Sequence, residues 1–313
     1  MTTVAGTGAK LGWIGTGRMG YEMAARLGRA GCDVLAWNRT KAKAEPLRAY
    51  GVKIADTLPE LAARDIVFTM VSTSDDLKEV LYGPGGLLMT RGVKARTVVD
   101  CSSISIEASA AIRADLAADG IGFLAAPVSG NAKVIKAGKL SVVCSGPRNV
   151  FEECEPYLRI FGPAGVSYVD EGELARIAKI CHNVFLGVVT QSLAEITVLA
   201  EKAGLPRSAF LDFMNNSVMG SVFSRYKTPA FVNLDFKVTF TPHLLRKDMD
   251  LGLAAGRRFE VPMPLASATR DLIQAQMGNG FTEQDFSTLL LMQARASGVE
   301  LKPENIPIDD GLS

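Results

Sequence analysis

A chain of 313 residues, 48% of them hydrophobic and 21% charged, is long enough to bury a large core and to form two domains. Its formal net charge of +1 and its lack of a long basic run exclude nucleic acid and a membrane surface as expected partners. Five scattered cysteines without a CxxC pair indicate a reducing, cytoplasmic location and small buried thiols. With only two histidines, no metal site is expected.

From residue 11 to 170, short apolar runs alternate with helical patterns. Such alternation predicts a parallel sheet with helices on both faces, and the continuously apolar runs fit a sheet that is buried on both sides. Strands are expected at residues 11–15, 33–38, 65–71, 96–102, 121–128 and 139–146. Helices are expected at residues 19–31, 41–50, 74–83, 105–120 and 150–162.

Beyond residue 171 the strand signals nearly cease. Residues 172–205 contain no proline and reach a helix-stopping glycine at Gly204, so they predict one helix of about thirty residues, roughly 45 Å long. Further helical patterns lie at residues 206–217, 240–259 and 265–278. The sequence therefore predicts a boundary near residue 170, with an α/β domain in residues 1–170 and an all-α domain in residues 171–313.

The sequence GTGRMG, residues 15–20, follows the first expected strand and begins the first expected helix. In that context a GxGxxG sequence binds a dinucleotide. Gly15 makes the turn, Gly17 lets the main chain approach a pyrophosphate, and Gly20 lets the helix pack closely on the strand. The first domain is thus expected to be a Rossmann-type doubly wound sheet, joined by the long interdomain helix to the helical domain. The remaining residues assigned to the cofactor in this loop are Thr16, Arg18 and Met19.

The end of the second expected strand indicates which dinucleotide binds. An acidic residue there accepts hydrogen bonds from the adenosine ribose and repels a 2′-phosphate. This chain instead has Asn38, Arg39 and Thr40, and a guanidinium and a hydroxyl suit a phosphate. NADP(H) is therefore expected rather than NAD(H), the alternative being that Arg39 is a solvated loop charge.

Five separated motifs, in order along nearly the whole chain, resemble those of the β-hydroxyacid dehydrogenase family. They are GTGRMG, NRT, DCSSIS (residues 100–105), APVSGNAKVIKAGKL (residues 126–140) and AKICHN (residues 178–183), with FTPHLLRKDMDL (residues 240–251) matching further on. The resemblance implies an NADP(H)-dependent oxidoreductase that interconverts a small 3-hydroxy acid and its semialdehyde or oxo acid by hydride transfer. It also implies a homodimer or homotetramer assembled through the helical domains.

The motif AKICHN matches the catalytic helix of the family, with Lys179 as the general acid and base and Asn183 beside it. The chemistry of these residues agrees. Hydride transfer between an alcohol and NADP+ needs a group that takes and returns the hydroxyl proton. Lys179 and Asn183 are four residues apart, so they share one face of the expected helix, and apolar neighbours can lower the pKa of the lysine.

The resemblance assigns the remaining site residues. Ser129, Gly130 and Asn131 form the substrate loop, and their hydroxyl, backbone N–H groups and amide can together bind a small carboxylate. The residues placed along the cofactor are Met70, Val71, Ser103, Phe240 and Lys247.

The chain departs from the family at four positions near these motifs. Many relatives have glycine at the position of Asn131 and asparagine at that of His182, and small residues where Glu173 and Arg176 stand. These departures leave the substrate open. Two other functions remain as alternatives: an imine reductase, which shares the fold and the WNRT sequence, and a non-catalytic dinucleotide-binding module. The presence of Lys179 argues against both.

Overall fold

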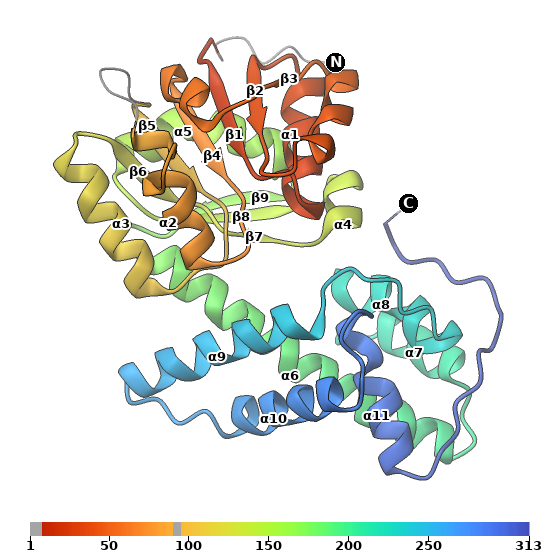
Figure 1. Ribbon diagram of the computed structural model, residues 1–313. Coiled ribbons are helices and arrows are strands. Elements are labelled where there is room, and N and C mark those ends of the chain that lie inside the picture. Colours follow the sequence, from red (N-terminus) through yellow and green to blue (C-terminus); the bar gives the residue numbers. More distant parts are fainter. Residues whose placement is uncertain (1–7, 90–94, 313) are drawn as a thin grey trace. The chain divides into compact units, whose positions relative to one another are not determined.

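The computed structural model describes residues 8–89 and 95–312. The chain divides into two compact units, Met1–Lys179 and Ile180–Ser313. The long helix α6 (Leu174–Lys202) begins in the first unit and continues in the second. Figure 1 shows the elements of both units.

The first unit contains a six-stranded parallel sheet in the order β3-β2-β1-β4-β5-β6. The chain winds outward from β1 in both directions, which is the doubly wound arrangement that the sequence predicts. The strands of this sheet are β1 (Leu11–Ile14), β2 (Val34–Trp37), β3 (Lys53–Ile54), β4 (Ile66–Thr69), β5 (Thr97–Asp100) and β6 (Gly122–Ala125). The helices of this unit are α1 (Arg18–Arg29), α2 (Ser74–Tyr82), α3 (Ile106–Ala118), α4 (Ala132–Lys136) and α5 (Arg148–Phe161).

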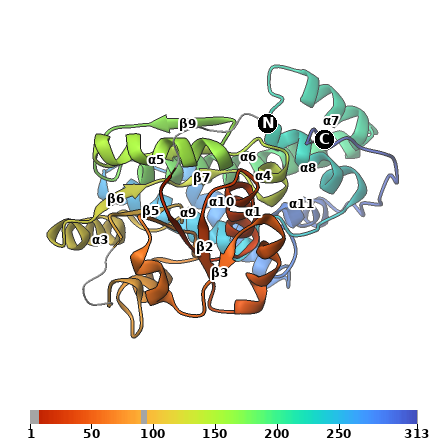
Figure 2. The same ribbon diagram turned by 90° about the horizontal axis from the view of Figure 1, so that it is seen from above.

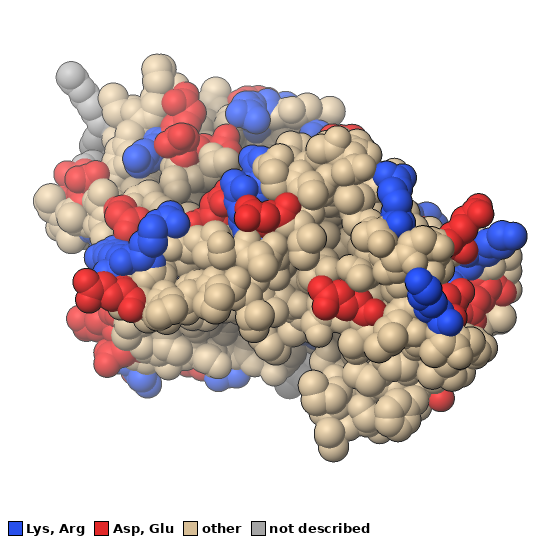
Figure 3. All heavy atoms as spheres, turned by 90° about the horizontal axis from the view of Figure 1, so that it is seen from below, with Lys and Arg blue, Asp and Glu red and all other residues tan. Residues whose placement is uncertain are grey.

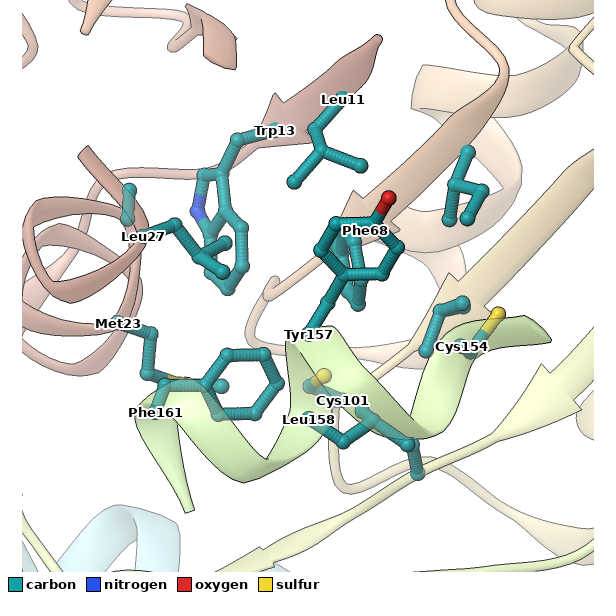
Figure 4. Close-up of a cluster of buried hydrophobic side chains, with 14 of the residues drawn as sticks. Leu11, Trp13, Met23, Leu27, Phe68, Cys101, Cys154, Tyr157, Leu158 and Phe161 are labelled. Carbon is teal, nitrogen blue, oxygen red and sulfur yellow. The ribbon is translucent and has the colours of Figure 1, made fainter. Parts of the chain in front are cut away.

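Neighbouring residues of each central strand face opposite sides of the sheet, and helices cover both sides. Trp13 and Phe68 stack with ring centroids 5.6 Å apart and pack with Phe161 of α5 and the buried residues of α1; Figure 4 shows this cluster. Val67 and Val98, each beside a residue of the first face, belong instead to a second core with α2 and α3. Burial on both faces explains why the strands are continuously apolar.

A second, smaller sheet lies in the same unit in the order β7-β8-β9, comprising β7 (Val128–Ser129), β8 (Ser141–Cys144) and β9 (Gly165–Tyr168). The expected strand at residues 121–128 is therefore divided between two sheets. Pro127 stands where it divides, and a proline cannot donate a hydrogen bond to a strand ladder. The run at residues 139–146 does form a strand, but β8 pairs antiparallel with β7 in the second sheet.

The helix expected at residues 41–50 is wrong. This segment forms two 3-10 turns, Lys41–Lys43 and Glu45–Tyr50, and it ends at Gly51 with φ +80°. Pro46 has no N–H for the helical hydrogen bond, and its ring excludes a helix that continues from the preceding turn.

The second unit is helical, as predicted. Beside α6 it contains α7 (Arg207–Asn216), α8 (Val222–Asn233), α9 (Pro242–Arg258), α10 (Pro264–Gly278) and α11 (Leu289–Ala296). The sequence did not reveal α8 or α11: α8 carries Pro229 inside it, and α11 spans only eight residues. Apolar side chains of α6, α7, α8 and α11 form the main core of this unit, including Leu193, Leu211, Phe231 and Leu290.

Four cysteines are buried, as the sequence predicts, whereas Cys181 on α6 is exposed. Burial raises the pKa of Cys144 to about 12, and it raises the pKa of Cys101 well above its ordinary value. These two thiols therefore stay protonated and serve as small apolar groups.

Within the described ranges, one helix is long and apolar enough to cross a membrane by length and composition alone, namely α6. More than half of its most apolar window is buried, as in the core helix of a globular domain. On the face shown in Figure 3, acidic and basic side chains are intermixed over largely neutral surface.

Candidate active site

The turn between β1 and α1 needs its first and last glycines for its own packing. Gly15 has φ +95°, and a Cβ there would lie 2.3 Å from the backbone oxygen of Met70. A Cβ on Gly20 would lie 2.0 Å from the backbone oxygen of Gly15. Neither position can accept a side chain without displacing backbone.

Gly17 is different, because a Cβ there would meet no protein atom within 4 Å. It precedes α1, whose first turn has no side-chain cap and no acidic residue. The hydroxyl of neighbouring Thr16 is buried and has no hydrogen-bond partner in the described part of the chain. Uncapped helix N–H groups, open space at a glycine and an unpaired hydroxyl together fit the pyrophosphate of a dinucleotide.

The side chain of Asn38 holds this turn against the end of β2. Its Oδ1 accepts a hydrogen bond from the backbone N–H of Thr16 (2.9 Å), and its Nδ2 donates to the backbone oxygen of Thr40 (2.9 Å). Both polar atoms of the amide thus bond to backbone groups of the protein. Asn38 fixes the backbone of the glycine turn, a role that residue type and position alone did not indicate.

Arg39, by contrast, projects into solvent with 86% of its side chain exposed. Its Nη1 lies 3.8 Å from Oδ1 of Asp76 on α2. An exposed pair at this distance contributes little stability, so the guanidinium can turn toward an anion at small cost. Thr40, which is also exposed, begins the following turn.

The carboxyl ends of β1, β4 and β5 bring several predicted cofactor residues together. The backbone N–H of Met70 donates to the backbone oxygen of Ile14 (2.9 Å), and that of Val71 donates to the Oγ of Ser102 (2.9 Å). Ser103 follows directly. In open α/β sheets, ligands bind beyond this edge, where the strand order changes direction.

The predicted substrate loop joins β7 to α4. Gly130 has φ +141°, and a Cβ there would lie 2.6 Å from Val134, so only glycine fits this turn. Asn131 is 7% exposed, and its Oδ1 accepts a hydrogen bond from the backbone N–H of Val134 (3.1 Å) to cap α4. Its Nδ2 has no partner among the residues that the structure describes. A buried amide donor in this state is costly unless a ligand completes it.

Helix α1 also anchors the predicted substrate loop. Arg26 of α1 donates from Nη1 to the backbone oxygen of Ile135 in α4 (3.1 Å) and from Nε to that of Ile160 (3.0 Å). Glu22, also on α1, pairs with Lys136 of α4 at 3.3 Å. The substrate loop is therefore fixed to the element that carries the cofactor turn.

Lys179 and Asn183 both lie on α6, four residues apart, and therefore project from the same side of this helix. Lys179 is half-buried, and Asn183 is 4% exposed. Asn183 Nδ2 donates to Asp248 Oδ2 (2.6 Å), and His182 Nδ1 lies 2.9 Å from Asn183 Oδ1. Both polar atoms of the amide are thus oriented, and because Asn183 Oδ1 can only accept, His182 donates from Nδ1.

Close packing of α6 and α9 within the second unit brings Asn183 and Asp248 together. A Cβ on Gly252, one turn after Asp248, would lie 2.1 Å from Val184. The two backbones approach closely at this glycine, as small residues allow. Asp248 is not among the residues that the sequence predicts for the site, although it directly follows Lys247 in the matched motif.

The other predicted residues of the second unit lie on and before α9. Lys247 is 28% exposed, and its Nζ is 3.2 Å from Asp248 Oδ1. Phe240 packs edge-on against Phe286 with ring centroids 5.9 Å apart. The structure thus brings Lys247 to Asn183 through Asp248, and it places Phe240 in an aromatic cluster. In the ranges described, no group of three or more His, Cys, Asp or Glu residues can hold a metal ion.

Two family models match the chain, one in each part. Residues 10–170 match the family model for the NAD binding domain of 6-phosphogluconate dehydrogenase. Residues 174–292 match that for the NAD-binding region of NADP-dependent 3-hydroxyisobutyrate dehydrogenase. The chain belongs to the β-hydroxyacid dehydrogenase family.

Individual members of this family are similar to this chain over most of its length. Glyoxylate/succinic semialdehyde reductase 2 of Arabidopsis thaliana is 29% identical over 90% of this chain and 78% of its own length. The 2-(hydroxymethyl)glutarate dehydrogenase of Eubacterium barkeri is 31% identical over 93% and 97%. The crystal structure of 3-hydroxyisobutyrate dehydrogenase from Salmonella typhimurium superposes with a TM-score of 0.81 at 25% identity, covering 91% of this chain and 99% of that one.

Membership places this chain among the hydroxyacid dehydrogenases, oxidoreductases that use a nicotinamide dinucleotide. The open turn at Gly17 and the uncapped start of α1 fit that cofactor.

Proposed function

We propose that this β-hydroxyacid dehydrogenase is an NADP(H)-dependent enzyme that interconverts a small 3-hydroxy acid and its semialdehyde or oxo acid. The observation that carries the proposal is on α6: Lys179 stands one turn before Asn183, whose amide is already oriented by Asp248 and His182. The buried, unpaired amide donor of Asn131 favours a carboxylate substrate over the imine of an imine reductase, and the oriented amide beside Lys179 favours an enzyme over a binding module.

The cofactor, when bound, supplies or accepts the hydride. The residues proposed to hold its pyrophosphate are Gly15, Thr16, Gly17, Arg18 and Met19. Met70, Val71 and Ser103 lie at the adjoining strand ends, and Arg39 with Thr40 is proposed for the 2′-phosphate. Phe240 and Lys247 of the second unit are also proposed to contact the cofactor.

Lys179 is proposed to move the proton. In the reductive direction, negative charge develops on the carbonyl oxygen of the substrate as its carbon is reduced. The Lys179 ammonium stabilises that charge and donates a proton from Nζ, and the resulting amine regains a proton from solvent. In the oxidative direction, the neutral amine takes the proton of the hydroxyl.

Asn183 is proposed to orient the substrate oxygen. With one N–H given to Asp248 and one acceptor direction to His182, the amide retains a second N–H and a second lone pair. Because the carboxylate of Asp248 fixes which atom is nitrogen, the remaining N–H has a defined direction. That gives the substrate oxygen a donor besides Lys179.

The substrate class follows from the loop at Ser129, Gly130 and Asn131. The unpaired Nδ2 of Asn131 is a buried donor suited to an anionic oxygen, and Ser129 adds a hydroxyl. Two of the relatives named above act, by their names, on glyoxylate or succinic semialdehyde and on 2-(hydroxymethyl)glutarate, all of which carry a carboxylate. A small aldehyde acid is therefore the proposed substrate.

Removal of the aldehyde's carboxylate tests this assignment. A semialdehyde acid should have a KM about 10- to 100-fold lower than its methyl ester, the value of a charge-assisted hydrogen bond. Asn131→Ser should remove most of this difference, because a serine still caps α4 but offers no second donor. The affinity for NADPH should not change. Equal KM values for acid and ester in the parent would assign this loop another role.

Arg39 provides the test of cofactor choice. Arg39→Gln should lower the preference for NADPH over NADH, measured as the ratio of kcat/KM values, by about 10- to 100-fold. Lys78→Gln removes an exposed positive charge from α2, two residues after Asp76 in the chain, and serves as the control. The ratio should stay at the parent value in that control. A parent enzyme that uses both cofactors equally well would contradict the proposal.

A further inference from the structure

Arg176 is a fully buried arginine in the first turn of α6, three residues before Lys179, and is 1% exposed. Its guanidinium donates three hydrogen bonds to the carboxyl end of β5 and to α3. The acceptors are Asp100 Oδ2 (2.6 Å), the backbone oxygen of Ser102 (2.7 Å) and Ser109 Oγ (3.0 Å). Because the guanidinium is planar and rigid, three such bonds fix both its position and its orientation.

Asp100, the partner of this arginine, is fully buried and orders the neighbouring strand ends as well. Its Oδ1 accepts hydrogen bonds from Thr69 Oγ1 (2.6 Å) and from the backbone N–H of Ser102 (3.2 Å). The Oγ of Ser102 accepts in turn from the backbone N–H of Val71 (2.9 Å). One carboxylate thus links the ends of β4 and β5 to the start of α6.

A second arginine holds the segment that enters α6. Arg113 of α3 donates to Glu173 Oε1 (2.6 Å) and to the backbone oxygen of Gly172 (2.7 Å). The backbone N–H of Ala175 donates to Ser145 Oγ (3.0 Å). The start of the helix is therefore held on both sides of Leu174, by contacts that all lie within the first unit.

A buried ion pair is a poor source of stability, because desolvation of both charges offsets most of their attraction. The pair of Arg176 and Asp100 instead fixes the position and orientation of the first turn of α6. We infer that Arg176 is a positioning residue, which fixes the first turn of α6 on the sheet edge and so holds Lys179 in place relative to Val71 and Ser103. The inference rests on the proposed role of Lys179.

Arg176→Lys is the main test, since it keeps the buried charge beside Asp100 but cannot make all three bonds. We expect a folded protein whose kcat is lowered by about tenfold or more, because small misplacements of a reacting group lower the rate strongly. The dissociation constant for NADPH should stay within about threefold, because Asp100 still orders the strand ends through Thr69 and Ser102. Backbone amides in residues 176–182 should exchange hydrogen faster.

Two further variants sharpen the experiment. The double variant Asp100→Asn/Arg176→Gln replaces the ion pair by two neutral amides that can bond to each other, and it should also lower kcat while leaving the NADPH affinity near the parent value. Arg159→Gln removes an arginine from a surface pair with Glu155 (2.9 Å) and should change none of the three quantities. If Arg176→Lys does not fold, the double variant carries the same test.

The inference is overturned if the folded variants keep the kcat and the exchange rates of the parent. It is also overturned if NADPH affinity falls as much as kcat, since the pair then serves the cofactor loops alone. Failure of the proposed function gives a different result: the parent itself reduces no aldehyde acid. Hydrogen exchange in Arg176→Lys still reports on the first turn of α6 in that case, and unchanged exchange overturns the positioning role.

Discussion

Replacement of Lys179 by alanine is expected to lower kcat by about 10²–10⁴-fold, the usual effect of removing a general acid and base. The alanine leaves no proton donor at this point of α6, and the amide of Asn183 cannot supply a proton. The dissociation constant for NADPH should remain near the parent value, since the cofactor turn lies at the start of α1. Steady-state turnover and a fluorescence titration with NADPH measure both quantities.

Two further lysine variants make the result specific. Lys179→Arg should recover little activity, because a guanidinium stays protonated and cannot accept the hydroxyl proton. Lys202→Ala removes a lysine from the other end of the same helix, where it bonds to the backbone oxygen of Ser297 (2.9 Å), and should keep normal turnover. Near-normal kcat in Lys179→Ala would mean that the proton comes from another group.

Gly17→Ala is expected to weaken NADPH binding by about 10- to 100-fold, the value of a lost charge-assisted contact. The added methyl meets no protein atom within 4 Å, and Gly17 has φ −66°, which alanine adopts without strain. Thermal stability should therefore be unchanged or slightly higher. The methyl would instead occupy the space through which a pyrophosphate approaches the main chain.

Two other glycines serve as controls for this variant. Gly165→Ala adds a methyl in open space at β9 and should change neither stability nor NADPH affinity. Gly20→Ala places a Cβ 2.0 Å from the backbone oxygen of Gly15 and should lower the melting temperature markedly. Parent-like NADPH affinity in Gly17→Ala would show that the pyrophosphate binds elsewhere.

The sequence predicted those features of the fold that depend on local chemistry. The turn at Gly15 and Gly20 was recognisable because only glycine fits there, and the long α6 because no proline interrupts it. The helix expected at residues 41–50 does not form because Pro46, in its middle, cannot make the helical hydrogen bond. The second sheet was missed because its first strand, β7, has only two residues.

The parts of the site that the sequence did not reveal depend on contacts between distant segments. Asn183 meets Asp248, 65 residues away, only because α6 and α9 pack closely at Gly252. Arg176 meets Asp100 across 76 residues. Both arginine and aspartate are ordinary surface residues by type, so nothing local marks them as buried partners.

NADPH oxidation by the purified protein, with a panel of small aldehyde acids, their methyl esters and a cyclic imine, tests whether the protein is an aldehyde-acid reductase. At least one aldehyde acid should be reduced, its ester should have a clearly higher KM, and the imine should not be reduced. Reduction of the imine with no turnover of any aldehyde acid would contradict this assignment.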